Sequence, residues 1–299
     1  MYPVYTFLGN EVDCKKKPIA FPPQEQPRQP GFEYMMTPRP ISENPYYAAA
    51  GKLLGKTAII TGGDSGIGRA VAYAFAKEGA NVTVVYYDEH VDAEETKLRI
   101  QAFGGRCLLA PGDVTVSSFA DQVVQRTLQS FGTVDILVNN AAFQPYQPSI
   151  LTLSDEQLEL TFRTNIFSYF YFARAAIPYM RRGSTIINTA SVVAYEGHKE
   201  LLDYSATKGA NVAFTRSLSL QLADAGIRVN TVAPGAVWTP LTVATFPAEA
   251  VKTFGTEVPL KRAAQPYELA SAYVYLASDD SSYVTGQTIH VNGGQSMSS

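Results

Sequence analysis

The sequence is short of the residues from which disulfide frameworks and metal sites are built. Its 299 residues include two cysteines, Cys14 and Cys107, and three histidines, all scattered along the chain. No C-x-x-C or H-E-x-x-H spacing occurs, so we expect neither a disulfide-stabilised fold nor a metal site. Sparse, unpaired cysteine is typical of a reducing compartment, and we expect a cytoplasmic protein.

Long apolar runs and basic clusters are also missing. No apolar stretch approaches the roughly 18 residues that cross a bilayer, and no basic segment followed by an apolar one opens the chain. The formal net charge is −3, and the one basic block is Lys15-Lys16-Lys17. We therefore expect no membrane and no nucleic-acid partner. What is present is a hydrophobic content of 46%, enough for the core of one large domain.

The first 50 residues differ from the rest in composition. They hold nine of the 18 prolines, and the run from Pro22 to Pro27 excludes both a helix and a central strand. A proline- and glutamine-rich terminus is often disordered, yet Phe21, Phe32 and their neighbours are too apolar for a simple linker. We expect a mobile start, and then an extended arm from about Phe21 that packs on the domain or on a neighbouring subunit. The domain itself should cover residues 51–299.

From residue 55 onward, apolar runs of strand length alternate with segments of helical periodicity. This alternation predicts an α/β fold, a doubly wound parallel seven-stranded sheet with helices on both faces, in a single Rossmann-like domain. Ligands of such sheets bind at the carboxyl ends of the strands. The expected strands are residues 57–61, 81–87, 106–110, 134–138, 185–188, 228–232 and 288–291, and the expected helices are 66–77, 92–103, 117–131, 154–180, 203–223 and 266–277.

A glycine-rich turn joins the first of these strands to the first helix. Its pattern, T-G-x-x-x-G-x-G, lets the backbone approach a pyrophosphate in front of a helix N-terminus. A glycine turn that binds nothing is the alternative, but the flanking strand and helix favour a nucleotide site. The expected cofactor contacts here are Gly62, Asp64, Ser65, Gly66, Ile67 and Gly68.

Polar and small residues also follow the third and fourth strands. Asp113 can accept a hydrogen bond from an adenine amino group while Val114 packs on the ring, although an aspartate there could equally cap the following helix. Asn140 and Ala141 follow the fourth strand in a sequence that suits a tight turn and leaves room for a ligand.

Four further residues could carry chemistry. Asn165 interrupts an apolar helix and Ser191 follows the fifth strand, where a helix kink and a turn cap are the ordinary interpretations. Tyr204 and Lys208 are four residues apart and so share one helix face, which by itself is typical of a surface pair. The four residues together are a much more specific sign of a catalytic site than any one of them alone.

Taken in order, these motifs resemble those of the short-chain dehydrogenase/reductase family. The glycine turn, Asp113, the N-N-A-A segment at 139–142, Asn165, Ser191 and Tyr204-x-x-x-Lys208 occur in the family's order, and the resemblance extends from about residue 52 to 294. Ala142 departs from it, since many members have glycine there. The sequence of the glycine turn and the proline-rich arm before it are similar to those of a glucose/ribitol-dehydrogenase-like subgroup. A P-G-x-x-x-T segment adds the expected cofactor contacts Pro234, Gly235, Val237 and Thr239.

The resemblance implies a mechanism as well as a fold. Hydride passes between a nicotinamide and a carbonyl or carbinol carbon, while Tyr204 donates or accepts the proton. Lys208 and the oxidised nicotinamide would favour ionisation of a phenol that otherwise titrates near ~10, and Lys208 would also grip the nicotinamide ribose. Ser191 would hold the substrate oxygen, Asn165 would open its helix slightly to hold a water linked to Lys208, and Thr239 would bind the carboxamide.

The choice between NAD and NADP depends on the end of the second strand. A carboxylate there would bind the adenosine 2′-hydroxyl and repel a 2′-phosphate. Tyr86 occupies that position, Asp88 follows two residues later, and Arg69 is the nearest candidate for a phosphate clamp. We expect NADP(H) to be favoured over NAD(H).

The substrate pocket should lie under a lid at about residues 240–258. Aromatic residues around its mouth predict a hydrophobic or aromatic ketone or aldehyde, with a sugar or polyol dehydrogenase as the alternative; they are Phe143, Tyr146, Tyr195, Trp238 and Phe246. A non-catalytic cofactor-binding sensor and an epimerase or dehydratase are further alternatives. The apolar helices at 162–179 and 206–222 predict a homodimer or homotetramer.

Overall fold

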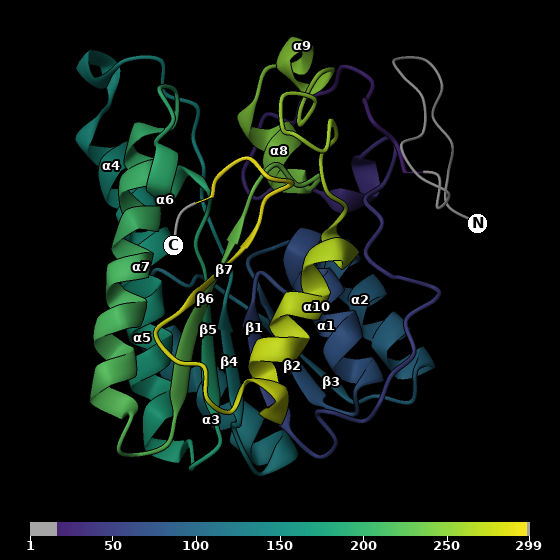
Figure 1. The fold of residues 1–299 in the computed structure, drawn as a ribbon, viewed down its shortest axis with the longest axis vertical. Helices are drawn as coiled ribbons and strands as arrows, with labels where there is room; N and C mark the ends of the chain where they lie inside the picture. The colour runs from purple at the N-terminus through teal and green to yellow at the C-terminus, as the bar shows by residue number, and fades with distance from the viewer. Residues whose placement is uncertain (1–16, 298–299) are drawn as a thin grey trace.

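Seven parallel strands form one sheet in the order β3-β2-β1-β4-β5-β6-β7 (Figure 1). The structure is a computed structural model that describes residues 17–297. The strand order reverses between β1 and β4, so their carboxyl ends border the crevice in which ligands of such sheets bind. The predicted doubly wound sheet is therefore confirmed. The strands are β1 (Thr57–Thr61), β2 (Asn81–Tyr86), β3 (Cys107–Pro111), β4 (Ile136–Asn139), β5 (Thr185–Thr189), β6 (Arg228–Pro234) and β7 (Thr288–Val291).

Helices cover both faces of the sheet. One apolar core lies between the sheet and α1, α2 and α10, and a second lies between the sheet and α3, α5 and α7. Both faces of the central strands are buried, which is why β1 is an unbroken apolar run rather than an alternating one. The helices are α1 (Gly66–Lys77), α2 (His90–Ala102), α3 (Ser117–Phe131), α4 (Asp155–Phe162), α5 (Ser168–Ala176), α6 (Val193–Glu196), α7 (Leu202–Leu222), α8 (Pro240–Thr245), α9 (Ala248–Val251) and α10 (Pro266–Ala277).

The helical tract expected over 154–180 is confirmed, since helical residues run without a break from Asp155 to Tyr179, but it is not regular α-helix throughout. A π-helical segment, η3 (Arg163–Phe167), separates α4 from α5, and a 3₁₀ turn, η4 (Ile177–Tyr179), ends the tract. Asn165 lies in the π segment, and its side-chain amide bonds the backbone of Phe143. Pro178 lies in the terminal 3₁₀ turn, where a missing N–H is tolerated.

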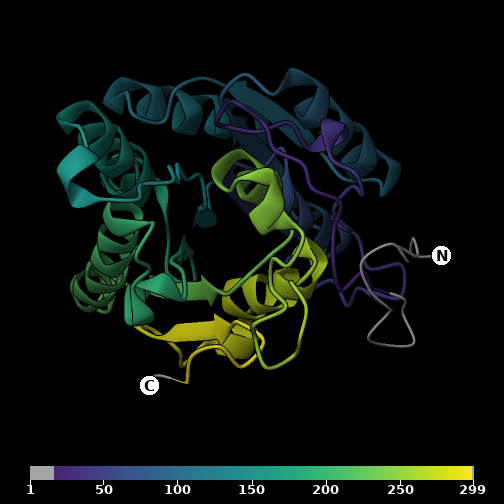
Figure 2. The same ribbon diagram turned by 90° about the horizontal axis from the view of Figure 1, so that it is seen from above.

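Residues 17–50 run as an extended arm across the outside of the domain, and Figure 2 shows this arm beside α8. Phe21 stacks on Trp238 with ring centroids 3.7 Å apart, and the Trp238 indole N–H donates to the carbonyl of Pro38 at 2.9 Å. The Gln26 amide donates to the carbonyl of Val243 in α8 at 2.7 Å. The expected mobile start, which includes Cys14, falls in residues 1–16, outside the described part of the chain.

Within residues 17–297, no helix has both the length and the apolar character needed to cross a bilayer. In the same part of the chain, no cluster of three or more His, Cys, Asp or Glu side chains is arranged to hold a metal ion.

Candidate active site

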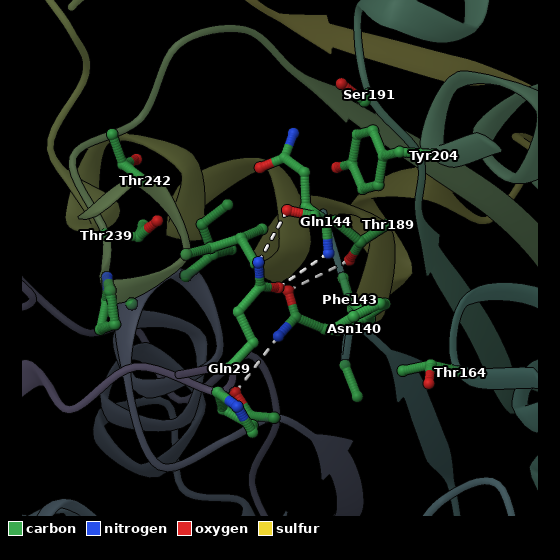
Figure 3. Close-up of a pocket in the computed structure, with 18 of the residues that line it drawn as sticks. Gln29, Asn140, Phe143, Gln144, Thr164, Thr189, Ser191, Tyr204, Thr239 and Thr242 are labelled. Carbon is green, nitrogen blue, oxygen red and sulfur yellow. Dashed lines mark hydrogen bonds between the residues drawn. The ribbon is translucent and has the colours of Figure 1, made fainter. Parts of the chain in front are cut away.

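A cavity of about 480 Å³ lies at the carboxyl ends of the strands, within the size range of small-molecule and cofactor sites. Its walls come from the arm, the glycine turn, the loops after β2 to β6 and helices α7 and α8. In Figure 3, Ser191 and Tyr204 lie on one side of this cavity, and Thr239 and Thr242 lie on the other.

The glycine turn is shaped for close backbone approach. Gly62 and Gly66 have positive φ angles of 63° and 53°, which non-glycine residues rarely adopt. A Cβ on Gly68 would lie 1.8 Å from the carbonyl oxygen of Gly62, so α1 can pack on the turn only with glycine there. Asp64, Ser65, Gly66 and Ile67 line the cavity where the helix N-terminus opens into it. This cradle fits the pyrophosphate of a dinucleotide.

The loop after β4 is fixed to the same turn. The Asn140 side-chain amide donates to the carbonyls of Thr61 and Gly62 at 3.1 and 3.2 Å, and the Thr61 hydroxyl accepts from the backbone amides of Asn140 and Ala141. Asn140 and Ala141 both line the cavity, as expected. Because the strand order reverses at this point, residues 79 positions apart hold each other in place.

The three residues expected to act on the substrate meet in the cavity wall. Ser191 follows β5, and its side chain lies beside that of Tyr204, whose pKa it lowers. The Lys208 ammonium lies 5.3 Å from the centre of the Tyr204 ring and donates to the carbonyl of Thr189 at 2.8 Å. Tyr204 and Lys208 both lie on α7, one turn apart, so the helix directs both side chains toward the same part of the cavity wall.

Burial changes the acidity of both groups. Burial raises the pKa of Tyr204 above its ordinary value, and the Ser191 side chain opposes this rise. Burial lowers the pKa of Lys208 to about 7. From the sequence we expected the pKa of Tyr204 to be lowered, but in the protein without cofactor desolvation raises it. A positive charge beside Tyr204 would be needed to reverse that shift.

Asn165 is fully buried behind these residues. Its side-chain oxygen accepts from the backbone amide of Phe143 at 2.7 Å, and its amide donates to the Phe143 carbonyl and to the Thr207 hydroxyl. It therefore joins the loop after β4 to α7 and lies in a locally widened helix, which agrees with the expected opening. No hydrogen bond between the Asn165 side chain and Lys208 occurs among the described contacts, so its contact with the catalytic pair is indirect.

The opposite end of the cavity holds the residues expected to meet the adenosine. Tyr86, Asp113 and Val114 line it, and the Asp113 carboxylate accepts from the Thr115 amide at 2.8 Å in the turn before α3, whose N-cap residue, Val116, provides no side-chain cap. Asp88 does not line the cavity, whereas the adjacent Glu89 does.

Two carboxyl groups at this end are buried. The side chain of Glu89 is only 1% exposed, and burial raises its pKa to about 8. Burial also raises the pKa of Asp64 to about 6. Sequence reasoning missed Glu89 because the direction of a side chain just after a strand depends on how the loop turns.

The segment at and after the end of β6 forms another wall of the cavity. Pro234, Gly235, Val237 and Thr239 all line the cavity, and Thr239 precedes α8 as its N-cap residue. A Cβ on Gly235 would lie 2.7 Å from Asn292, so glycine is needed there for packing.

Arg69 does not serve as the phosphate clamp that its position suggested. Its side chain is 2% exposed, and it donates to Glu33 of the arm, to Asp92 and to the carbonyl of Asp64. The Glu33 carboxylate also accepts from the backbone amide of Gly66 at 2.6 Å. The guanidinium therefore supports the glycine turn from behind instead of facing a ligand.

The aromatic mouth differs from the expectation. Phe143 and Phe246 line the cavity, but Tyr146, Tyr195 and Trp238 do not. Trp238 is fully buried because Phe21 of the arm covers it.

The arm itself contributes residues that sequence reasoning did not place in the site. Gln29 donates to the carbonyls of Gln144 and Ala244 at 2.7 and 3.1 Å and accepts from the Gln144 amide at 2.9 Å (Figure 3). It thus links the loop after β4 to α8. The apolar character of the arm was the one available signal that it packs on the domain.

These features define a dinucleotide-dependent oxidoreductase: a glycine cradle at a helix N-terminus, and a tyrosine with serine and lysine partners opposite it. A family model described as enoyl-(acyl carrier protein) reductase matches residues 62–296. The chain belongs to the short-chain dehydrogenase/reductase family, and it is an NAD(P)-dependent oxidoreductase acting on CH–OH or C=O groups.

Curated relatives match over nearly their whole length. The uncharacterized oxidoreductase YhdF of Bacillus subtilis (strain 168) is 61% identical, covering 92% of this chain and 96% of the relative. Glucose and ribitol dehydrogenase of Daucus carota is 53% identical, with 92% and 96% covered. NADPH-dependent aldehyde reductase 1, chloroplastic, of Arabidopsis thaliana is 50% identical, with 92% and 98% covered.

A solved structure shares the fold. It is that of a short-chain dehydrogenase from Burkholderia cenocepacia J2315 in complex with NADP, with a TM-score of 0.77 and 26% identity, covering 82% of this chain and 99% of that one.

Proposed function

We propose that this protein reduces an apolar aldehyde or ketone with NADPH. The observation that carries the proposal is the position of the Tyr204 hydroxyl, which meets Ser191 in a cavity whose substrate end contains Phe143, Leu201 and Phe246. A relative that is 50% identical is named an NADPH-dependent aldehyde reductase, which supports both the substrate class and the cofactor.

A nicotinamide held in this cavity would supply the hydride, and the protein supplies position and a proton. Ser191 hydrogen-bonds the carbonyl oxygen and keeps it within reach of the Tyr204 hydroxyl. Tyr204 donates its proton to that oxygen as negative charge develops there. The phenol is protonated at neutral pH and so holds the proton that it donates, while a neighbouring positive charge would offset the weaker acidity that burial causes.

Lys208 stabilises the ionised form of Tyr204. Its ammonium lies 5.3 Å from the Tyr204 ring centre and can favour the phenolate left after proton transfer. Burial lowers the pKa of Lys208 to about 7, so the lysine can itself pass on a proton near neutral pH. Asn165 holds the loop of Phe143 against α7 and so fixes the wall beside the reacting carbonyl.

A sugar or polyol dehydrogenase is the second candidate. The same cavity wall carries Gln144, His198 and Gln295, which can hydrogen-bond hydroxyl groups, and a relative that is 53% identical is named glucose and ribitol dehydrogenase.

The test is a spectrophotometric assay with both cofactors. Purified protein is mixed with NADPH or NADH and a panel of aliphatic and aromatic aldehydes and ketones, and with NADP⁺ or NAD⁺ and a panel of sugars and polyols. We expect the fastest turnover with NADPH and apolar carbonyls, whereas faster turnover of the sugars would favour the second candidate. Turnover of neither panel would contradict both.

A matched pair of variants tests the role of Tyr204. Tyr204→Phe should lower kcat/KM by about 10²–10⁴-fold, the usual contribution of a positioned acid. Tyr195→Phe removes the hydroxyl of a nearby tyrosine that packs on His290 outside the cavity, and it should leave the rate within about twofold.

We propose a homodimer or homotetramer in the cytoplasm. Phe167 and Phe170, beside and on α5, are 43% and 52% exposed, and a second copy could cover them. The free thiol of Cys107 suits a reducing compartment. Size-exclusion chromatography with light scattering measures the mass of the assembly.

A further inference from the structure

The arm forms one wall of the cavity. Gln29, Pro30 and Gly31 line it beside Gln144 and α8, and the preceding Arg28 pairs with Glu89, which lines the cavity after β2. Gly31 packs closely on α8, since a Cβ on it would lie 2.9 Å from the carbonyl oxygen of Pro240. A cofactor in this cavity therefore meets the arm as well as the domain.

The charges on the domain side of the adenosine end are unfavourable for a phosphate. Asp64 lines it, and Asp88 directly precedes Glu89, which also lines it but is largely protonated at neutral pH because burial raises its pKa to about 8. Among the described residues that line the cavity, Lys208 is the one lysine or arginine, and it lies at the nicotinamide end. Arg69 is enclosed by Glu33 and Asp92 and is 2% exposed. The residues of the domain alone would repel the 2′-phosphate of NADP(H).

A cation of the arm lies just outside this end: Arg28 does not itself line the cavity but precedes Gln29 and Pro30, which do. One guanidinium nitrogen of Arg28 pairs with the Asp88 carboxylate and lies 3.4 Å from Glu89. The Arg28 Nε–H donates to the carbonyl of Pro30 at 2.9 Å, and its guanidinium lies 4.2 Å from the centre of the Phe32 ring. The arm thus holds Arg28 in a fixed direction beside the end of β2.

The guanidinium of Arg28 can nevertheless exchange its Asp88 partner for another anion. The Arg28 side chain is 33% exposed and that of Asp88 is 46% exposed, and ion pairs at this exposure contribute little to stability. A phosphate offers a guanidinium two or more oxygens and a larger charge than one carboxylate. Exchange of Asp88 for a phosphate at Arg28 therefore costs little and gains a stronger contact.

We propose that Arg28 of the arm binds the 2′-phosphate of NADP(H), so that the arm, not the domain, supplies NADP(H) selectivity. The inference rests on the proposed function, because it takes a nicotinamide dinucleotide as the ligand of this cavity. Arg28 acts by direct contact with the cofactor, whereas Gln29 and Gly31 shape the wall around it.

The experiment compares ligands that differ only in the 2′-phosphate. Calorimetric titrations measure the Kd of NADPH, NADH, 2′,5′-ADP and 5′-AMP for the full-length protein and for Arg28→Gln. We expect Arg28→Gln to weaken NADPH and 2′,5′-ADP at least tenfold and to change NADH and 5′-AMP by less than threefold. Arg28→Lys, which keeps the charge but loses the fork geometry, should recover part of the loss.

Arg99→Gln is the matched control. Arg99 also pairs with a carboxylate across the arm–domain contact, with Glu43 at 2.7 Å, and also lies over an aromatic ring, that of Phe103. Unlike Arg28, which pairs with the cavity-lining Glu89, Arg99 pairs with no residue that lines the cavity, so Arg99→Gln should leave all four affinities within twofold. Melting temperatures of the variants check that each one folds.

The outcomes separate this inference from the proposed function. If neither NADPH nor NADH binds the unmodified protein, both fail. If the protein binds a dinucleotide but Arg28→Gln changes NADPH and NADH affinity equally, or changes neither, only the role of Arg28 is overturned. Binding of NADH alone by the unmodified protein would also overturn it.

Discussion

Glu33 links the arm to the glycine turn, and its removal should destabilise the whole protein. Its carboxylate is 1% exposed, lies 2.7 Å from Arg69 and accepts from the Gly66 amide at 2.6 Å. Removing one partner of a buried ion pair typically costs about 3–5 kcal/mol, because the remaining charge is left in a medium that solvates it poorly. The substitution Glu33→Gln keeps the shape and an acceptor for Gly66 while it removes the charge.

The expected loss is at the lower end of that range, about 3 kcal/mol. Asp92 still pairs with Arg69 at 3.1 Å in the variant, and Glu95 lies 3.6 Å from it. Burial raises the pKa of Glu33 although Arg69 opposes the rise, so in the unmodified protein desolvation outweighs the ion pair's stabilisation of the charged carboxylate. At about 2–4 °C per kcal/mol, the melting temperature should fall by about 6–12 °C.

Glu43→Gln provides the comparison. Glu43 is also an arm carboxylate with two cationic partners, Lys77 at 2.8 Å and Arg99 at 2.7 Å, but its side chain is 24% exposed. Such surface pairs contribute about 0–1 kcal/mol. Calorimetric and urea unfolding of the two variants at one protein concentration measures the difference. A Glu33→Gln variant as stable as Glu43→Gln would refute the view that the arm is anchored through a buried charge.

Two further predictions concern the cofactor cavity. Gly68→Ala should weaken dinucleotide binding at least tenfold in a calorimetric titration, because its Cβ would lie 1.8 Å from the Gly62 carbonyl oxygen and the turn must move. Glu89→Gln should flatten the dependence of melting temperature on pH. The folded-state pKa of Glu89 is about 8 against an ordinary value of 4.5, so this group's stabilisation is complete below pH 4.5 and is lost as the pH rises through 8. A glutamine cannot ionise, so the variant should lose less stability than the unmodified protein between pH 5 and 8.

Each of these predictions has a control in the chain. A Cβ on Gly209 in α7 would meet nothing within 4 Å, so Gly209→Ala should leave dinucleotide binding unchanged and add about 0.5–1 kcal/mol of stability. Glu249→Gln alters an exposed pair with Lys252 and should leave the pH profile unchanged. Equal dinucleotide affinity for both glycine variants, or parallel pH profiles for Glu89→Gln and the unmodified protein, would contradict the corresponding argument.

The sequence by itself determined the sheet and the catalytic group. The alternation of apolar and helical segments gave β1, β7, α1, α3 and α10 with the observed bounds, because those elements follow local periodicity. Tyr204 and Lys208 share a helix face at four-residue spacing, and Ser191 follows a strand that ends beside them. Local rules and the parallel topology are enough to bring these side chains to one edge of the sheet.

Tertiary structure alone decided how the arm completes the site. The sequence indicated that the arm was apolar, but not that Glu33 would reach Gly66 or that Gln29 would reach Gln144, 115 positions away. It also pointed to Arg69 as a phosphate partner, although buried acids of the arm and α2 surround that guanidinium. Apart from the 3₁₀ turn at Glu33–Met35, the described part of the arm forms no helix or strand that would fix its path, so its contacts depend on the surface that it crosses, and only the folded domain provides that surface.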